Sequence, residues 1–315
     1  MSAGSSKPIV LVTGADLAPE AQAILAGFEL VYAGRTPNED DLVRLCQAHD
    51  PVAIIVRYGR ITARIIAACS SLKVISKHGS GIDTIDVDTA AARGIAVKAA
   101  AGANAAAVAE HTWALILACA KSVIELNERM HAGHWDKATH KSLELDGLTL
   151  GLIGLGAIGA RVAAIGIAMG MRVIVFDPYV KSPSAGIVRQ SLDEVLTNSD
   201  VLSLHCPLTA SNKGFLNRNA FARMRKGAVL VNTARGGLID DAAMLDALKS
   251  GQLRAAGLDT FAVEPPSADH ALRGVPGTTL SPHIGGVTSA AYTKMGVGAA
   301  RNIVETLAIP TVLPT

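Results

Sequence analysis

Three polar residues in the second half of the chain have the side chains needed to oxidise an alcohol or reduce a ketone. Arg235, Glu264 and His283 each lie in a loop rich in glycine or proline, just after a short apolar segment. A histidine can take up or return a hydroxyl proton near neutral pH. A carboxylate bonded to its other ring nitrogen favours the imidazolium, and an arginine fork binds a carboxylate in two places. Taken singly, the three have structural explanations: a solvated arginine, a turn glutamate and a structural histidine. Together they predict the catalytic residues of a hydride-transfer site.

A glycine-rich turn upstream predicts where the hydride carrier binds. The apolar segment Leu148–Ile153 runs into Gly154, Gly156 and Gly159, and an alanine-rich helical pattern follows to Met169. The first glycine can adopt the positive φ of a tight turn. The second leaves room for a pyrophosphate, and the third lets helix and strand pack closely. The helix amino terminus then faces the phosphates. The predicted cofactor-binding residues of this turn are Gly154, Gly156, Ala157, Ile158 and Gly159.

An acidic residue then indicates which dinucleotide binds. A second apolar segment, Arg172–Phe176, ends in Asp177, which lies 18 residues after Gly159. An acid at this place can accept hydrogen bonds from both ribose hydroxyls and repels a 2′-phosphate. The alternative is a turn aspartate before Pro178. A glycine pattern alone is weak, but the strand, turn, helix and second strand together predict a site that prefers NAD.

Composition excludes several classes of protein. The 315 residues correspond to about two domains. Half of the residues are hydrophobic and only 3% are aromatic, which suits α/β layers. The net charge of only +2 gives no indication that the protein binds nucleic acid or an anionic membrane. Mean hydropathy is +0.34, but no apolar run reaches the roughly 18 residues of a membrane span.

The cysteines and the amino-terminal segment indicate the cellular compartment of the protein. Cys46, Cys69, Cys119 and Cys206 form no CxxC pair and lie mostly in apolar segments, which favours buried free thiols over disulfides. The leader MSAGSSK lacks the apolar core of a secretory signal. We therefore expect a cytoplasmic protein, and we predict no metal site.

The first third of the chain alternates short strands with helical patterns. The expected strands are Ile9–Val12, Glu29–Tyr32, Ala53–Val56, Lys73–Ser76 and Ile95–Val97. The expected helices are Pro19–Ala26, Glu39–His49, Thr62–Cys69 and Val87–Arg93. Such alternation predicts a parallel sheet with helices on both faces. Loops Val56–Arg60 and His78–Asp83 follow two of the strands, where open α/β sheets bind ligands.

The remaining elements predict a second sheet and a discontinuous first domain. Ala105–His131 is expected as one long helix, either a link between domains or an ordinary core helix. The later strands are expected at Val201–Leu204, Ala228–Val231, Ala255–Leu258 and Thr279–Leu280, with helices at Leu192–Asn198, Arg218–Met224 and Asp240–Lys249. The last helical pattern, Ser289–Leu307, should pack on the first domain. The prediction is therefore an α/β protein with two doubly wound parallel sheets. A Rossmann domain (103–287) is inserted in a discontinuous flavodoxin-like substrate domain (1–102 plus 288–315).

Several motifs in one order give the chain a specific likeness. They are HGSGIDTID (His78–Asp86), NAAAVAEH (Asn104–His111), GLIGLGAIG, LHCPLT (Leu204–Thr209), VNTARGGLID and SPHIGG. The sequence resembles the D-isomer-specific 2-hydroxyacid dehydrogenases, which include D-3-phosphoglycerate dehydrogenase and hydroxypyruvate/glyoxylate reductase. The resemblance runs over nearly the whole chain.

The resemblance implies further roles. His283 would be the acid/base, Glu264 its carboxylate partner and Arg235 the substrate clamp. The backbone of Ser80 and Gly81 would hold the substrate carboxylate. Further cofactor contacts would come from Cys206, Pro207, Thr233, Ala234, Asp259 and Gly286. Domain closure and homodimers formed through the nucleotide-binding domains are also implied.

Two departures from the family pattern bear on regulation and the hinge. Ala99–Ala101 precedes Gly102 where the family usually has Asn-Thr-Pro. The chain also stops soon after its last helix, so we expect no C-terminal regulatory domain and no serine feedback.

The substrate is left open between alternatives. Arg57 and Arg60 favour a second anionic group on the substrate, as in 3-phosphoglycerate, unless they are solvated loop charges. The alternative within the family is a hydroxypyruvate or glyoxylate reductase without a second anion site. An alternative of another class is an NAD-gated corepressor that binds peptide partners.

Overall fold

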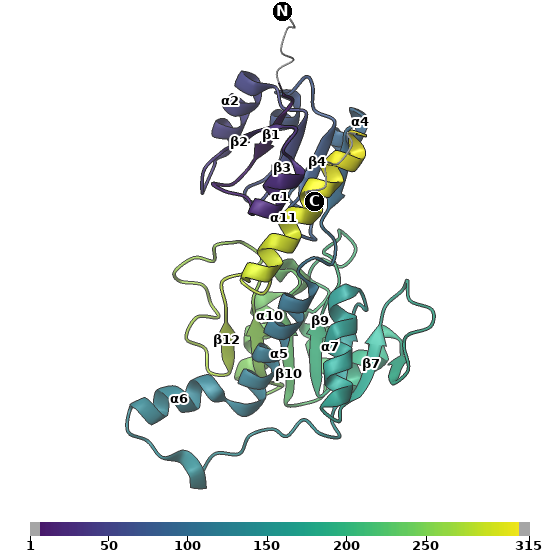
Figure 1. Ribbon diagram of the computed structural model, residues 1–315. Helices are drawn as coiled ribbons and strands as arrows, with labels where there is room; N and C mark the ends of the chain where they lie inside the picture. Colours follow the sequence, from purple (N-terminus) through teal and green to yellow (C-terminus); the bar gives the residue numbers. More distant parts are fainter. Residues whose placement is uncertain (1–6, 309–315) are drawn as a thin grey trace, which may run out of the picture. The chain divides into compact units, whose positions relative to one another are not determined.

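The computed structural model describes residues 7–308, and these form two compact units (Figure 1). One unit contains the chain up to Asn104 together with the chain from Val287 on, and the other contains Ala105–Gly286.

The first unit is built on five parallel strands in the order β2-β1-β3-β4-β5. The strands are β1 (Ile9–Val12), β2 (Glu29–Tyr32), β3 (Ala53–Val56), β4 (Val74–Lys77) and β5 (Ala96–Ala99). The helices are α1 (Pro19–Ile24), α2 (Glu39–His49), α3 (Ala63–Ala67), α4 (Val87–Ala92) and α11 (Ser289–Thr306). Every residue of β3 is buried, as expected of an apolar run covered on both faces.

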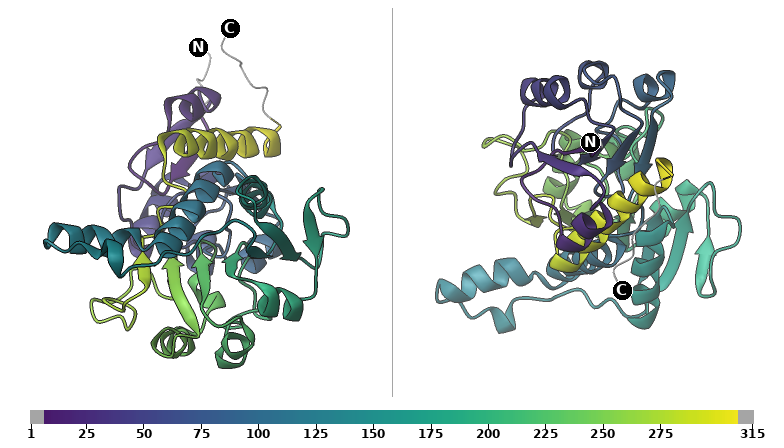
Figure 2. Two further views of the ribbon diagram at one scale, coloured as in Figure 1. Left: turned by 90° about the horizontal axis from the view of Figure 1, so that it is seen from below. Right: turned by 45° about the horizontal axis from the view of Figure 1, so that its top comes forward.

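Separate apolar clusters lie on the two faces of this sheet. The helices α2 and α3 contribute to one cluster, which includes Leu42 and Ile65. In the other, Ile303 of α11 and Ala21 of α1 pack with Val10 of β1, and Figure 2 shows α11 lying along α1. The C-terminal helix therefore completes the first sheet, and this unit is discontinuous in sequence as predicted.

The second unit is built on seven parallel strands in the order β12-β11-β10-β9-β6-β7-β8. The strands are β6 (Thr149–Ile153), β7 (Arg172–Phe176), β8 (Ile187–Arg189), β9 (Val201–Leu204), β10 (Ala228–Asn232), β11 (Leu253–Leu258) and β12 (Thr278–Leu280). The α-helices are α5 (Ala105–Lys121), α6 (Val123–His131), α7 (Ala157–Ala168), α8 (Leu192–Asn198), α9 (Arg218–Arg223) and α10 (Asp241–Lys249). Short 3₁₀ turns lie at Asp136–Ala138 and Gly236–Leu238. The predicted pair of doubly wound parallel sheets is confirmed.

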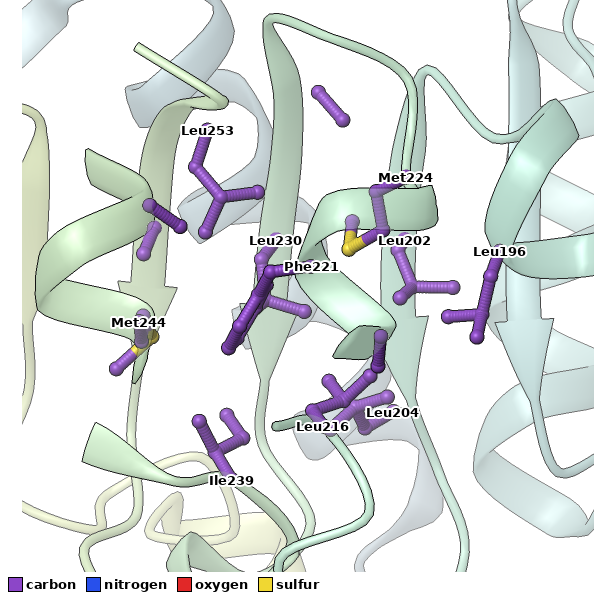
Figure 3. Packing of buried hydrophobic residues seen from close by; sticks show 14 of the residues in the cluster. Leu196, Leu202, Leu204, Leu216, Phe221, Met224, Leu230, Ile239, Met244 and Leu253 are labelled. Carbon is purple, nitrogen blue, oxygen red and sulfur yellow. The ribbon is translucent and has the colours of Figure 1, made fainter. Parts of the chain in front are cut away.

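Two large cores hold this second sheet between its helices. On one face Phe221 of α9 and Met244 of α10 pack with Leu202 and Leu230 of the central strands (Figure 3). On the other face α5 and α7 contribute a cluster that includes Trp113. Strand β6 is hydrogen-bonded to both β7 and β9. The strands β7 and β8 are added on one side of β6 and the strands β9 to β12 on the other, so the strand order reverses at β6. Ligands bind at such a switch point in open α/β sheets.

The predicted single helix Ala105–His131 is wrong, because the chain breaks at Ser122. Ser122 has a positive φ of 52°, and the helices on its two sides are bent by 60°. The apolar segment α5 is largely buried in the second unit, whereas α6 has no buried residue. Helical spacing continues through the serine, so the sequence pattern does not reveal the break.

The short edge strand β8 was not predicted. Its three residues pair with Val173–Val175 of β7, and only Ile187 is partly buried. A three-residue edge strand carries too little alternation to be recognised from sequence.

Among residues 7–308, no single helix is long and apolar enough to cross a membrane. The helices α5 and α6 meet that length and composition only as a bent pair.

Candidate active site

The glycine turn has the geometry that its sequence predicts. Gly154 has a φ of +99°, and a Cβ there would lie 2.6 Å from the His205 carbonyl oxygen. A Cβ on Gly159 would lie 2.3 Å from the Gly154 carbonyl oxygen. Gly156 differs, since a Cβ there would meet nothing within 4 Å. The turn is therefore closely packed against backbone atoms at Gly154 and Gly159, and it has open space beside Gly156.

This open side fits the pyrophosphate of a dinucleotide. Gly156 is the N-cap of α7, and Ala157 and Ile158 are its first two residues. The unpaired N–H groups and positive dipole end of a helix favour an anion. The residues present thus fit the predicted cofactor.

Asp177 lies directly after β7 and supports the glycine turn. Its side chain accepts hydrogen bonds from the backbone N–H groups of Leu155 (2.8 Å), Tyr179 (2.8 Å) and Val180 (3.2 Å). The residue is 8% exposed. The carboxylate therefore ties the loop after β6 to the loop after β7. Its contact with the ribose stays a prediction. The bonds from Tyr179 and Val180 are those of the turn aspartate that the sequence offered as the alternative, and only the bond from Leu155 was not foreseen.

The other predicted cofactor residues follow strands at the same edge of the second sheet. Cys206 and Pro207 come after β9, Thr233 and Ala234 after β10, Asp259 after β11, and Gly286 after β12. Carboxyl ends of parallel strands share one edge, which the glycine turn after β6 also occupies. The structure therefore gathers these residues at one edge, and their contacts with the cofactor stay a prediction.

Arg235 follows β10 in a turn shaped by a buried asparagine. Asn232 is fully buried. Its Nδ2 donates to the Arg235 carbonyl oxygen (2.9 Å), and its Oδ1 accepts from the Ala234 N–H (2.9 Å). The arginine is half-buried, and its Nη1 donates to the Ala234 carbonyl oxygen at 2.7 Å. The arginine backbone is thus held at the end of the strand.

Glu264 and His283 form a direct pair. The Glu264 Oε2 lies 2.7 Å from the His283 Nδ1, and the Glu264 Oε1 accepts a hydrogen bond from the Phe261 N–H at 2.9 Å. The hydrogen bond to Glu264 raises the pKa of His283 above its ordinary value, against the opposing effect of burial. Burial opposes ionisation of Glu264, but its hydrogen bonds with His283 and the Phe261 N–H lower its pKa overall. The pair therefore favours imidazolium and carboxylate.

Arg235 is close enough to affect both members of this pair. Its positive charge lowers the pKa of Glu264 and also counteracts the rise in the pKa of His283. The structure thus brings together the three residues that the sequence predicts as catalytic.

A buried carboxylate holds the loop that carries His283. Asp259 is 1% exposed. Its Oδ1 accepts hydrogen bonds from the Ser281 hydroxyl (2.6 Å) and the Ile284 N–H (2.9 Å), and its Oδ2 accepts from the Gly285 N–H (2.8 Å). These bonds flank His283, whose φ is +53°. A non-glycine residue needs such support in the left-handed region.

His111 also joins this network, a role that the sequence alone does not indicate. The His111 Nε2 lies 2.8 Å from the Ser281 Oγ and 3.3 Å from the Asp259 Oδ1. His111 belongs to α5, so it comes from a distant part of the chain. Its place in the motif NAAAVAEH was a signal, but the pattern does not say what the imidazole contacts.

The predicted substrate-binding residues of the first unit follow β3 and β4. Ser80 and Gly81 lie in the loop after β4, where the Ser80 hydroxyl donates to the Asn104 Oδ1 at 3.1 Å. Arg57 directly follows β3, and its guanidinium forms an ion pair with Asp16. The two loops extend from the carboxyl ends of neighbouring strands.

Comparison with known proteins identifies the family. Residues 113–285 match the model of the D-isomer specific 2-hydroxyacid dehydrogenase, NAD binding domain. The chain belongs to this family. It is 38% identical over 290 residues to the hydroxypyruvate reductase of Thermotoga maritima, covering 91% of this chain and 94% of that protein. It is likewise 38% identical over 255 residues to the D-3-phosphoglycerate dehydrogenase of Mycobacterium leprae, covering 80% of this chain and 48% of the relative.

Solved structures agree with the family assignment. The crystal structure of a glyoxylate reductase from Paecilomyes thermophila is similar with a TM-score of 0.88 at 30% identity, and 98% of each chain is covered. This 2-hydroxyacid dehydrogenase is therefore an NAD-dependent oxidoreductase that moves a hydride between nicotinamide and a small D-2-hydroxy or 2-keto acid. The comparisons give no support to a corepressor.

Proposed function

We propose that this dehydrogenase reduces a small 2-keto acid with His283 as proton donor, Glu264 as its partner and Arg235 as the carboxylate clamp. The observation that carries the proposal is the 2.7 Å contact between Glu264 and the His283 Nδ1. It lies at the sheet edge that also carries the glycine turn. Because Nδ1 faces Glu264, the other ring nitrogen, Nε2, is the one available to a substrate oxygen.

The proton transfer follows from this arrangement. When bound, NADH supplies the hydride to the carbonyl carbon. The His283 Nε2 donates its proton to the carbonyl oxygen as that oxygen gains charge, and the neutral imidazole accepts the hydroxyl proton in the reverse direction. Glu264 keeps the proton on the ring before transfer. The Arg235 guanidinium matches the planar carboxylate and orients the substrate.

The backbone of Ser80 and Gly81 is a further part of the proposal. Both residues lie in the loop after β4, and ligands of open α/β sheets bind beyond the carboxyl ends of strands. We infer that their N–H groups bind the substrate carboxylate.

Turnover tests this proposal directly. NADH oxidation is followed with hydroxypyruvate, glyoxylate and pyruvate for the wild type, for His283→Asn and for a control, His49→Asn, at the last residue of α2 in the first unit. Loss of the general acid should lower kcat by about 100-fold or more, while the control keeps wild-type activity. If no 2-keto acid is turned over, or if His283→Asn is as active as the control, the proposal is wrong.

We also infer that the protein is a homodimer formed through α6 and the segment after it. Val123, Ile124, Met130 and Trp135 are between 49% and 74% exposed. Figures 1 and 2 show α6 extending away from the sheet of its own unit. Exposed apolar side chains on a projecting arm are typical of an interface.

A cytoplasmic location and the absence of nucleic-acid or membrane partners are further proposals. All four cysteines are free, and three of them are buried, which fits a reducing compartment. The net charge of +2 gives no electrostatic basis for binding polyanions. Fractionation of cells that produce the protein would test its location.

A further inference from the structure

Arg57, one of the two arginines that the sequence offers as candidates for binding a second anion, is already paired within the first unit. Arg57 directly follows β3, and its side chain is only 10% exposed. Its Nη1 forms an ion pair with the carboxylate of Asp16, which lies in the loop after β1 and is 69% exposed. The positive charge of Arg57 is therefore neutralised by Asp16 of the same unit, and the Asp16 side chain is exposed to solvent.

The arginine is held in this position from several sides. The Thr13 hydroxyl oxygen accepts a hydrogen bond from the Arg57 N–H at 3.0 Å. The side chain crosses Gly14, where a Cβ would lie 2.9 Å from the Arg57 Cδ. The guanidinium carbon lies 5.2 Å from the ring centre of Tyr58 and 4.9 Å from that of Tyr292. A cation over the face of an aromatic ring is stabilised there, so these contacts hold the Arg57 side chain in place.

Asp16 is held in place as well. The Tyr292 hydroxyl donates a hydrogen bond to its Oδ1 at 2.9 Å. The hydrogen bond from Arg57 and then that from Tyr292 lower the pKa of Asp16, so it is ionised at neutral pH. Burial lowers the pKa of the neighbouring His78 to about 4, so this histidine is neutral. The ion pair of Arg57 and Asp16 therefore carries no net charge, and His78 adds none.

The ion pair lies where the substrate loops of this unit begin. Strands β1, β3 and β4 are adjacent in the sheet, and Asp16, Arg57 and the Ser80 loop follow their carboxyl ends. Any anion approaching Arg57 meets the carboxylate of Asp16 on the same guanidinium. Like-charge repulsion of this kind is an effective way to reject a ligand.

We propose that Asp16 determines the charge class of the substrate: by pairing with Arg57 it excludes 2-keto acids with a second anionic group and admits those with a neutral substituent. The inference rests on the proposed function and narrows it to keto acids such as hydroxypyruvate. Asp16 is thus a specificity-determining residue in a loop remote in sequence from the catalytic residues.

The test compares two substrates that differ only in a phosphate group. We would measure kcat/KM with NADH for hydroxypyruvate and 3-phosphohydroxypyruvate. The wild type should prefer hydroxypyruvate. Asp16→Asn keeps the shape and removes the charge, so it should move the ratio toward the phosphorylated substrate by about 10-fold or more. The shift should vanish in Asp16→Asn combined with Arg57→Met, because the guanidinium released by the first substitution is then gone.

Two controls separate charge from structure. Tyr292→Phe removes a hydrogen bond from Asp16 but leaves its charge, and should leave the substrate ratio nearly unchanged. Asp40→Asn breaks another exposed ion pair of the same unit, with Arg64 at 2.5 Å, and should leave it unchanged too.

Binding measurements keep the inference testable without turnover. Titration of the NADH-bound protein with glycerate and 3-phosphoglycerate, a combination that cannot transfer a hydride, should show the same shift in Asp16→Asn. Failure of the wild type to turn over any keto acid would count against the proposed function alone. An unmoved ratio in Asp16→Asn, an equal shift in Asp40→Asn, or a wild type that prefers the phosphorylated ligands would each overturn the role of Asp16.

Discussion

Replacing Glu264 by glutamine should displace the pH dependence of both reaction directions to lower pH. The glutamine keeps the size of the side chain and removes its charge. Since the hydrogen bond to Glu264 is the main cause of the raised pKa of His283, this pKa should fall. Reduction needs the imidazolium, so its rate falls as pH rises through that pKa. Oxidation needs the neutral ring, so its rate falls as pH drops through the same pKa.

The size of the shift follows from the contact and its exposure. The Nδ1–Oε2 distance is 2.7 Å, and the side chains of His283 and Glu264 are 48% and 36% exposed. A hydrogen bond to a charged group contributes about 1.5–3 kcal/mol, and solvent screening of a half-exposed pair reduces this. About 1.4 kcal/mol remains, which corresponds to a decrease of about one pKa unit. The charges of Arg235 and Asp259 act on the histidine in both proteins.

The assay is a pair of pH profiles of kcat/KM, one for ketone reduction with NADH and one for alcohol oxidation with NAD. In Glu264→Gln both limbs should move to lower pH together, by about one unit. Glu264→Asp, which keeps the charge, serves as the matched control and should stay closer to the wild type. A general loss of activity with neither limb displaced would show that Glu264 only shapes its loop through the Phe261 N–H. The pairing argument would then be refuted.

Three further predictions concern the cofactor and the assembly. Gly156→Ala should weaken NADH binding without lowering the melting temperature, because its Cβ would meet no protein atom within 4 Å. Gly159→Ala should weaken NADH binding and also lower the melting temperature, because its Cβ would lie 2.3 Å from a carbonyl oxygen. Equal melting temperatures of the two variants would contradict this prediction. Asp177→Ala should narrow the preference for NADH over NADPH by about 10-fold in kcat/KM, and by leaving backbone N–H groups unpaired it should cost about 2 kcal/mol of unfolding free energy; an unchanged cofactor ratio would remove the residue from the ribose site. Ile124→Lys combined with Trp135→Lys should convert a dimer to a monomer in light scattering at unchanged helicity, and a dimer that persists would place the interface elsewhere.

Much of the fold was readable from the sequence because its signals are local. The buried strand Ala53–Val56 and the turn at Gly154 depend on residues that are neighbours in the chain. An apolar run between polar loops predicts a parallel strand. Regular alternation of strands and helices then places Arg235 and His283 at the ends of strands. The candidate catalytic residues could therefore be named before their contacts were known.

Other features could not be read in this way, because they depend on which segments become neighbours. The pairing of Arg57 with Asp16 spans 41 residues, and the support of the histidine loop by Asp259 draws on His111 of α5. The break at Ser122 is equally invisible in a continuous helical pattern. Polar partners at long separation leave no periodic trace in the sequence.

By itself, the sequence determined the kinds of groups this protein carries and the strand ends at which they stand, because hydrophobic periodicity and glycine turns act over a few residues. Only the tertiary structure decided how those groups are charged and held. Asp177 ties two loops together, Asp259 supports the left-handed backbone of His283, and Asp16 cancels the charge of Arg57. The physical reason is that hydrogen bonding and ion pairing require contact within a few ångströms. That contact exists only after the strands have packed side by side.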